Sequence, residues 1–259
     1  MAKFLQAGFV SSSIKAATKR VILGMVLFGT MASAPSSKAD TITVGPAFGI
    51  YQTGGGGEFT FVPDAPIAAL LGEYSPFTVN QYYANSFQTF CAEENERIYT
   101  STTYDVNLNN VTVYGGITLS VGAAALYREF ATGTLPLYNY ADIGSVNYHT
   151  RAYDPANPGI GSAYQLQRAI WYFMGHQVAY DSANIYENGT VPVPINPFAA
   201  DNGAHRVAVL NTWVQGQPHD LAHARQDSLI LTPIPEPSVF ALTSFGLAGL
   251  ALRKRRASA

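Results

Sequence analysis

Cys91 is the only cysteine in the 259-residue chain, so it cannot form a disulfide within one molecule. Its sulfur can remain a thiol, bridge to a second molecule, or enter another kind of covalent bond. A buried, inert thiol is the common case. Two neighbours give this cysteine chemical context: the aromatic Phe90 precedes it, and Glu93 follows two positions later. The Glu93 carboxylate either faces solvent or lies on the same face as the sulfur, where it could assist proton transfer or orient an amide.

Gln167 is the second residue of chemical interest, because its spacing predicts a buried amide. The run around it predicts a helix with Ser162 as N-cap and Gly175 as C-cap. A buried amide needs hydrogen-bond partners, and a satisfied core glutamine is the ordinary explanation. The residues three and four positions away, which share its face, are small, apolar or aromatic: Ala163, Tyr164, Ile170 and Trp171.

Short β-type segments surround these two residues and must position them. Alternation near a period of two places Cys91 on a predicted strand, with Phe87 and Thr89 on the same face and Glu93 following them. The predicted strands cover residues 41–44, 58–62, 85–93, 104–108, 110–114 and 228–231.

Two further segments have helical character. Ser120 is a candidate N-cap for a helix ending at Gly133, and an amphipathic pattern predicts a helix over 204–214, with Val207, Leu210, Trp213 and Val214 facing inward. The sequence shows no internal repeat and no interior linker. It therefore predicts a single α+β domain, in which an antiparallel β-sandwich or barrel-like part carries a helical insert.

The N-terminal segment has the features of a secretory signal peptide over residues 1–39. Basic residues precede an apolar run at 21–31, and small residues follow at 32–34 and 37–39. The apolar run is too short to span a bilayer comfortably, which disfavours a permanent anchor. Cleavage after residue 34 would leave Pro35 beside the cut, so we expect the mature protein to begin at Asp40.

The C-terminal segment, residues 235–259, contains three features in a fixed order. A Pro-Glu-Pro motif, an apolar run at 239–252 and a basic end follow one another. A short apolar helix with basic residues behind it would be held in the membrane with the basic end in the cytoplasm. The residues of the motif and of the basic tail are Pro235, Glu236, Pro237, Arg253, Lys254, Arg255 and Arg256.

This order closely resembles the PEP-CTERM sorting signal of exported proteins from Gram-negative bacteria that make extracellular polysaccharide. The resemblance implies a precursor tethered to the inner membrane, cleavage near Pro-Glu-Pro by an exosortase, and a mature form at the cell surface or outside the cell. An ordinary tail anchor is the alternative. The expected organisation is a signal peptide (1–39), an exported domain (40–234) and a sorting signal (235–259).

Removal of both terminal segments changes the charge of the protein. Only six of the fifteen basic residues, all arginines, lie between Asp40 and Leu252, together with all 17 acidic residues, which gives a net charge of about −11. Nucleic acid is therefore not an expected partner. All five lysines lie in the terminal segments, at positions 3, 15, 19, 38 and 254.

Two short motifs together resemble those of the Cys-Gln thioester-forming domains of bacterial surface proteins. In that family an aromatic residue or leucine precedes the cysteine, an acidic residue stands two positions after it, and Gln-x-Ala-Ile-Trp occurs downstream. This chain has Leu166 where the family usually has threonine. The matching stretches are Phe90-Cys91-Ala92-Glu93 and Gln167-Arg168-Ala169-Ile170-Trp171.

The resemblance implies that Cys91 is the thiol donor, Gln167 the acyl donor, Glu93 the matching acid and Trp171 the aromatic residue that closes the second motif. Thiolate attack on the glutamine carboxamide would expel ammonia and leave a thioester, provided that both groups are held in contact away from water. The expected supporting and shielding residues are Glu93, Phe90, Tyr164, Ile170 and Trp171.

The implied function is covalent attachment of an exported surface or matrix protein to an amine-bearing target, either a surface protein or an exopolysaccharide, in adhesion or matrix association. A mature chain without lysine cannot attack its own thioester through a lysine amine. The alternative is a structural protein of the extracellular polysaccharide or biofilm matrix, in which the cross-link only stabilises the fold or is absent.

An enzyme is a weaker hypothesis, and no cofactor or metal is expected. None of the five histidines lies in a recognisable nucleophile signature beside Cys91. His219 and His223 would share a face if they lay on a helix, but two ligands do not define a zinc site.

Overall fold

The computed structural model describes residues 39–45, 52–53, 56–79, 83–140 and 161–233. The predicted signal peptide, apart from Ala39, and the whole predicted sorting signal lie outside these residues. Both therefore remain predictions from the sequence. No helix within the described ranges combines the length and the apolar character needed to cross a membrane.

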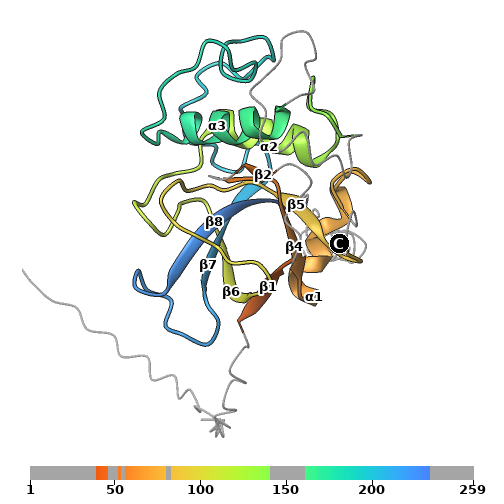
Figure 1. Ribbon diagram of the computed structural model, residues 1–259, viewed down its shortest axis with the longest axis vertical. Helices are drawn as coiled ribbons and strands as arrows, with labels where there is room; N and C mark the ends of the chain where they lie inside the picture. Colours follow the sequence, from red (N-terminus) through yellow and green to blue (C-terminus); the bar gives the residue numbers. More distant parts are fainter. Residues whose placement is uncertain (1–38, 46–51, 54–55, 80–82, 141–160, 234–259) are drawn as a thin grey trace, which may run out of the picture. The chain divides into compact units, whose positions relative to one another are not determined.

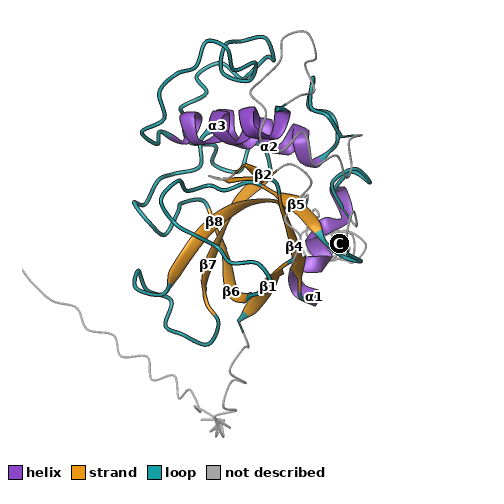
Figure 2. Cartoon of the chain, viewed as in Figure 1, coloured by secondary structure: helices purple, strands orange, loops and turns teal. Residues whose placement is uncertain are grey.

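Six strands form one antiparallel sheet in the order β5-β4-β1-β6-β7-β8 (Figures 1 and 2). Both β7 and β8 carry a run of consecutive buried residues, so apolar faces alone do not set their register. Two very short strands, β2 (Gln52–Thr53) and β3 (Gly56–Gly57), pair separately. The strands of the large sheet are β1 (Asp40–Val44), β4 (Phe59–Pro63), β5 (Phe87–Thr89), β6 (Thr103–Asn109), β7 (Val207–Val214) and β8 (Ala224–Leu231).

The chain beyond β5 bends the sheet into a nearly closed barrel. Residues 90–92, which we name the closing segment, meet β8: the N–H of Leu229 donates to the carbonyl of Phe90 at 3.0 Å, and the N–H of Ala92 donates to the carbonyl of Asp227 at 2.8 Å. Cys91 and Ser228 face each other in the antiparallel bridge between these bonds. Cys91 therefore lies where the two ends of the sheet meet.

Two long helices lie side by side across one end of the barrel (Figures 1 and 2): α2 (Val121–Ala131) and α3 (Ser162–Met174). The N-cap of α2 is Ser120, as predicted, and its hydroxyl accepts from the N–H of Ala123 at 3.2 Å. A four-residue helix, α1 (Ala65–Ala68), continues into a 3₁₀ turn (Ala69–Glu73) beside β4.

The ends of α3 are set by two glycines in the left-handed conformation, Gly161 with φ 73° and Gly175 with φ 83°. The predicted C-cap is thus confirmed. The prediction that Ser162 is the N-cap is wrong: Ser162 is the first helical residue, and its hydroxyl accepts from the N–H of Asn139 at 3.2 Å. A glycine provides the left-handed turn into the helix at a lower steric cost.

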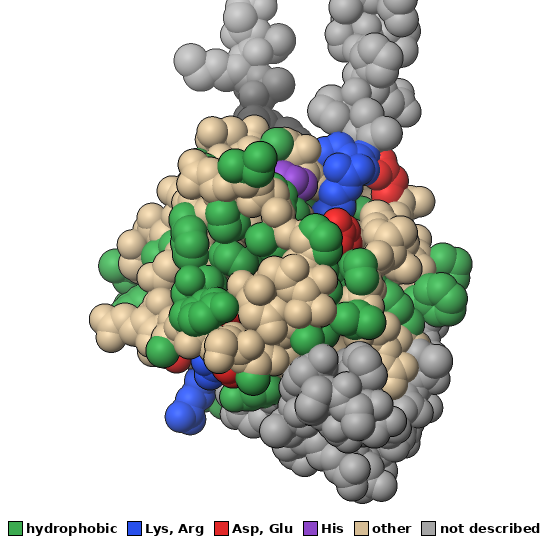
Figure 3. Space-filling model, turned by 90° about the horizontal axis from the view of Figure 1, so that it is seen from above, with side chains coloured by type: hydrophobic (Ala, Val, Ile, Leu, Met, Phe, Trp, Pro, Cys, Tyr) green, Lys and Arg blue, Asp and Glu red, His purple; other side chains and the backbone are tan. Residues whose placement is uncertain are grey.

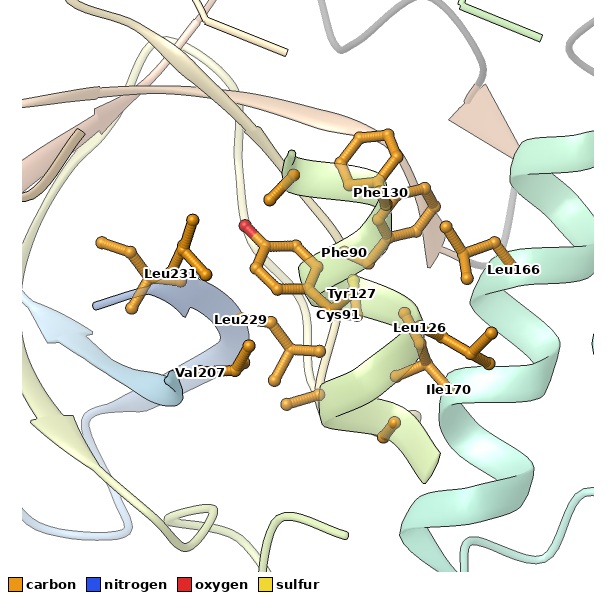
Figure 4. Packing of buried hydrophobic residues seen from close by; sticks show 14 of the residues in the cluster. Phe90, Cys91, Leu126, Tyr127, Phe130, Leu166, Ile170, Val207, Leu229 and Leu231 are labelled. Atoms are coloured by element: carbon orange, nitrogen blue, oxygen red, sulfur yellow. The ribbon is translucent and has the colours of Figure 1, made fainter. Parts of the chain in front are cut away.

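The core lies between the helix pair and the closure of the barrel. Phe90 and Cys91 from the closing segment meet side chains of both helices and of β8 (Figure 4). The ring of Phe90 packs edge to face on Phe130, with 4.9 Å between the ring centroids and an interplanar angle of 86°. The other labelled members of this cluster are Leu126, Tyr127, Leu166, Ile170, Val207, Leu229 and Leu231.

The predicted α+β fold with a barrel-like antiparallel sheet is confirmed, but two local predictions are wrong and one strand was predicted too long. Residues 204–214 are not a helix, because β7 (Val207–Val214) pairs with β6 and β8. Their β-branched and aromatic residues suit a strand between two neighbours. Residues 110–114 form a turn with one bridge, and the strand predicted over 85–93 is shorter, Phe87–Thr89.

Candidate functional site

The side-chain amide of Gln167 is bound to the backbone of Cys91 by two hydrogen bonds. The N–H of Cys91 donates to Oε1 at 2.9 Å, and Nε2 donates to the carbonyl of Cys91 at 2.9 Å. Cys91 is 0% exposed and Gln167 is 1% exposed. The prediction that Gln167 faces the interior is thus confirmed, and the structure brings together the two residues of the paired motifs.

The geometry of the barrel closure explains why the Cys91 backbone is available to Gln167. The bonds to β8 come from the residues on either side, Phe90 and Ala92, so Cys91 and Ser228 form a non-hydrogen-bonded pair. In such a pair the N–H and carbonyl of Cys91 point away from β8. The Gln167 amide therefore takes the place that another strand would have along this edge, and satisfies two buried backbone groups.

The C-terminal half of α3 and the residue after its C-cap bind the backbone of Ala92 and Glu93, which follow Cys91. Nε1 of Trp171 donates to the carbonyl of Glu93 at 3.0 Å. Nε2 of His176, just beyond the helix, lies 2.8 Å from the carbonyl oxygen of Ala92, to which it donates. Three side chains thus bind the backbone of the consecutive residues 91–93 and fix its conformation. They belong to Gln167, Trp171 and His176.

Glu93 is buried, with 2% of its surface exposed, so the solvent-facing alternative for this carboxylate is excluded. Its Oε1 accepts from the N–H of Tyr114 at 2.7 Å, and its Oε2 accepts from the N–H of Asp227 at 3.2 Å. These bonds anchor the turn after β6 and the strand β8 to the end of the closing segment. The carboxylate therefore has a positioning role here, through backbone groups on two other elements.

A second buried carboxylate, Asp227 on β8, lies beside Glu93. It accepts from the N–H of Val113 at 2.6 Å, from Nδ2 of Asn211 at 2.7 Å and from the N–H of Thr212 at 3.1 Å. Burial raises the pKa of Glu93 and of Asp227, and the nearby Glu93 charge raises the pKa of Asp227 further. Asp227 was not among the residues predicted from the sequence, although it directly precedes the predicted strand 228–231.

The supporting residues named from the sequence do not all line the site. Phe90 and Ile170 are fully buried and Trp171 is 7% exposed, so these three exclude water from the pairing. Tyr164 is 38% exposed, and its ring faces the guanidinium of Arg168 at 5.9 Å, so its predicted shielding role is wrong. Tyr164 lies three residues before Gln167, at the edge of the buried face.

Two further buried glutamines were not predicted from the sequence, one at the site and one elsewhere on α3. Gln226 of β8 donates from Nε2 to the carbonyl of Glu93 at 2.7 Å. Gln165 is buried on α3, where its Oε1 accepts from the N–H of Ile185 at 2.8 Å and supports the loop after the helix. Neither belongs to the paired motifs, and only the tertiary structure shows what they bind.

The arrangement suits attack by the Cys91 sulfur on the Gln167 carboxamide. The two hydrogen bonds place the carboxamide beside the backbone of the residue that carries the thiol, and proximity is one requirement for such an attack. The N–H of Cys91 already donates to the oxygen on which negative charge would develop in a tetrahedral intermediate, and such a donor is the main element of an oxyanion hole. A backbone donor is thus in place at the side-chain oxygen of Gln167.

The described residues contain no group of three or more His, Cys, Asp or Glu side chains that could hold a metal ion. His219 and His223 do not lie on a helix. His219 stacks on Trp213, with 4.3 Å between the ring centroids, and Nδ1 of His223 lies 2.7 Å from the Asp220 carboxylate. They therefore have separate partners.

Comparisons of the chain with protein-family models, with curated proteins and with solved structures find no match.

Proposed function

We propose that this chain is an exported cell-surface or extracellular matrix protein that forms a thioester between Cys91 and Gln167 and uses it to attach covalently to an amine-bearing target. The observation that carries the proposal is the paired hydrogen bonding of the Gln167 amide to the Cys91 backbone in a fully buried setting. No other cysteine competes for this role.

The proposed chemistry has two steps, and the bonds formed and broken balance in each. In formation, the sulfur adds to the amide carbon, the C–N bond breaks, and the thiol proton leaves with the NH₂ group as ammonia. In capture, the amine of the target adds to the thioester carbon, the C–S bond breaks, and an amine proton passes to the sulfur. The product is an amide bond through Gln167, with the Cys91 thiol restored.

The terminal segments support export, and the distribution of lysines along the chain supports covalent attachment to another molecule. The signal peptide and the PEP-CTERM-like segment indicate passage through the inner membrane, processing by an exosortase, and release to the surface or matrix. All lysines lie in those segments, so the exported part has no lysine amine to consume its own thioester. The target is then a protein or a polysaccharide that carries primary amines.

The surface on the side of α2 and α3 bears mainly hydrophobic and uncharged polar side chains, with few charged ones (Figure 3). A target that meets this face would contact it chiefly through neutral groups. Because Cys91 and Gln167 are buried, a target amine reaches the thioester carbon only if the side chains that cover the pair move.

Intact mass spectrometry of the purified protein tests the proposal. Wild type and Cys91→Ala undergo the same processing at the ends, so their mass difference does not depend on where the ends are cut. We expect wild type to be lighter by one ammonia than its sequence requires, and Cys91→Ala and Gln167→Ala to have their full masses. Wild-type protein of full mass when freshly prepared would rule the thioester out.

The alternative function is a structural matrix component. The observation that favours it is that both polar atoms of the Gln167 amide already have backbone partners, as in a satisfied core glutamine. Methylamine separates the cases. A methylamine adduct at Gln167 indicates a reactive centre for capture, a thioester that resists methylamine indicates a stabilising cross-link, and full mass before treatment indicates that no cross-link forms.

A further inference from the structure

Ser228 on β8 is the direct cross-strand neighbour of Cys91. The bonds on either side of the pair, from Leu229 to Phe90 and from Ala92 to Asp227, make it a non-hydrogen-bonded pair. In this type of pair the two side chains lie on the same face of the sheet, and the Cα atoms are about 4.5 Å apart, closer than in the hydrogen-bonded type. The side chains of Ser228 and Cys91 are therefore cross-strand neighbours.

The Ser228 hydroxyl is buried without a partner among the described residues. The residue is 1% exposed, and its Oγ has no hydrogen bond. Other buried hydroxyls nearby are satisfied: Thr89 donates to the carbonyl of Leu229 at 2.5 Å, and Thr212 donates to the carbonyl of Gln226 at 2.9 Å. An unpaired buried hydroxyl is costly, so its presence beside the only cysteine needs an explanation.

The reaction proposed above supplies one. We propose that the Ser228 hydroxyl is the hydrogen-bond donor that supports the Cys91 sulfur when it carries negative charge, both in thioester formation and in capture. This inference rests on the proposed function. The Gln167 amide lies along the edge of Cys91 that points away from β8, and Ser228 lies on the β8 side. Cys91 is thus placed between the residue that carries the electrophile and the residue that carries the donor.

The serine does not transfer a proton in either step. During formation it stabilises the thiolate that attacks the amide carbon, and the thiol proton still leaves with ammonia. During capture it stabilises the thiolate that departs when the C–S bond breaks, until the sulfur takes the proton from the amine. In the resting thioester the sulfur is neutral and a weak acceptor, so the hydroxyl acts when charge develops.

Ser228→Ala tests the inference in three measurements. We expect the rates of ammonia loss after refolding and of methylamine capture to fall roughly 10- to 100-fold, the range for one hydrogen bond to a charged group. Ser228→Thr, which keeps the hydroxyl, should retain most of the rate. Stability should stay equal or rise, because Ser228→Ala removes a buried hydroxyl that has no partner.

The matched control is Thr89→Val, which removes a neighbouring buried hydroxyl that already has a partner. It should lower stability and leave both rates within a few-fold of wild type. Unchanged rates in Ser228→Ala, or an equal loss in Thr89→Val, would overturn the role of Ser228.

A separate readout keeps this inference distinct from the proposed function. In a Gln167→Ala background no thioester can form, and the ultraviolet absorbance of the thiolate follows the titration of Cys91. Adding Ser228→Ala should move the titration midpoint upward by about one pH unit or more. If wild type has its full mass, the proposed function fails while this titration still decides whether Ser228 supports the sulfur. An unmoved midpoint rejects it.

Discussion

Trp171 on α3 and Gln226 on β8 donate hydrogen bonds to the same atom, the carbonyl oxygen of Glu93. Nε1 of Trp171 lies 3.0 Å from this oxygen and Nε2 of Gln226 lies 2.7 Å from it. A carbonyl oxygen has two lone pairs and accepts both donors. One helix and one strand, distant in sequence, are therefore joined through a single backbone group directly after the closing segment.

Removing both donors should cost more than the sum of the separate losses. Trp171→Phe and Gln226→Met each leave the Glu93 carbonyl with one donor, so we expect about 1 kcal/mol for each lost bond. The double variant leaves a buried carbonyl without a partner, and we expect an additional loss of about 1 kcal/mol or more. Urea unfolding of the four proteins in a double-mutant cycle measures this coupling.

Trp213→Phe is the matched control for Trp171→Phe. Trp213 is also 7% exposed, but its Nε1 has no hydrogen-bond partner among the described residues. The same substitution there removes no hydrogen bond and should show no coupling to Gln226→Met. Additive losses at Trp171 and Gln226 would contradict the shared-acceptor interpretation.

Gln167 should contribute strongly to stability even when no thioester can form. In a Cys91→Ala background the backbone N–H and carbonyl at position 91 still pair with the Gln167 amide. Adding Gln167→Ala leaves both groups buried without this partner, and we expect a loss of about 2–5 kcal/mol in the free energy of unfolding. Denaturant titration measures it. Gln217→Ala at an exposed position should change stability by less than about 0.5 kcal/mol, and an equally small loss at Gln167 would show that its pairing is unimportant.

Stability should fall as pH rises through the titration range of Glu58. Burial raises the pKa of this carboxyl from 4.5 to about 7, and the hydroxyl of Tyr138, which donates to it at 2.6 Å, opposes the rise. The folded protein then keeps a proton that the unfolded chain has lost. The stabilisation is complete below pH 4.5 and is lost as pH approaches about 7, with a total change of roughly 3 kcal/mol.

The comparison of wild type with Glu58→Gln isolates this group, because the amide cannot ionise. Urea unfolding between pH 4 and about pH 8 should show the difference between the two proteins growing in the stated window and levelling off above it. A difference that stays constant with pH would show that the Glu58 carboxyl titrates normally.

Gly122 should tolerate no side chain, because it lies at the contact between α2 and its neighbours. A Cβ there would come within 2.8 Å of both the Phe173 ring and the Pro197 side chain. Gly122→Ala should therefore cost about 1–3 kcal/mol through overpacking, despite the better helix propensity of alanine. Gly72→Ala is the control: nothing lies within 4 Å of a Cβ at that position, and we expect no loss in thermal unfolding. Equal stability of the two variants would contradict the close packing at Gly122.

The sequence by itself determined the local features of the site. Helical spacing around Gln167 predicted a buried amide, since Ala163, Ile170 and Trp171 share its face, and a single cysteine left Cys91 as the one thiol. Periodicity identifies the faces of individual elements because side-chain direction repeats with the backbone. The terminal segments, which lie outside the described residues, are known only from their residue patterns.

Tertiary structure decided what meets Cys91 and whether 207–214 is a strand. The apolar spacing of that segment suits a helix or a strand, and its pairing with β6 and β8 settles the choice. Asp227 bonds to Glu93 across 134 residues, and Ser228 faces Cys91 only because the barrel closes at this point. Local patterns contain no information on such pairing, since the register of distant strands depends on the packing of the whole sheet.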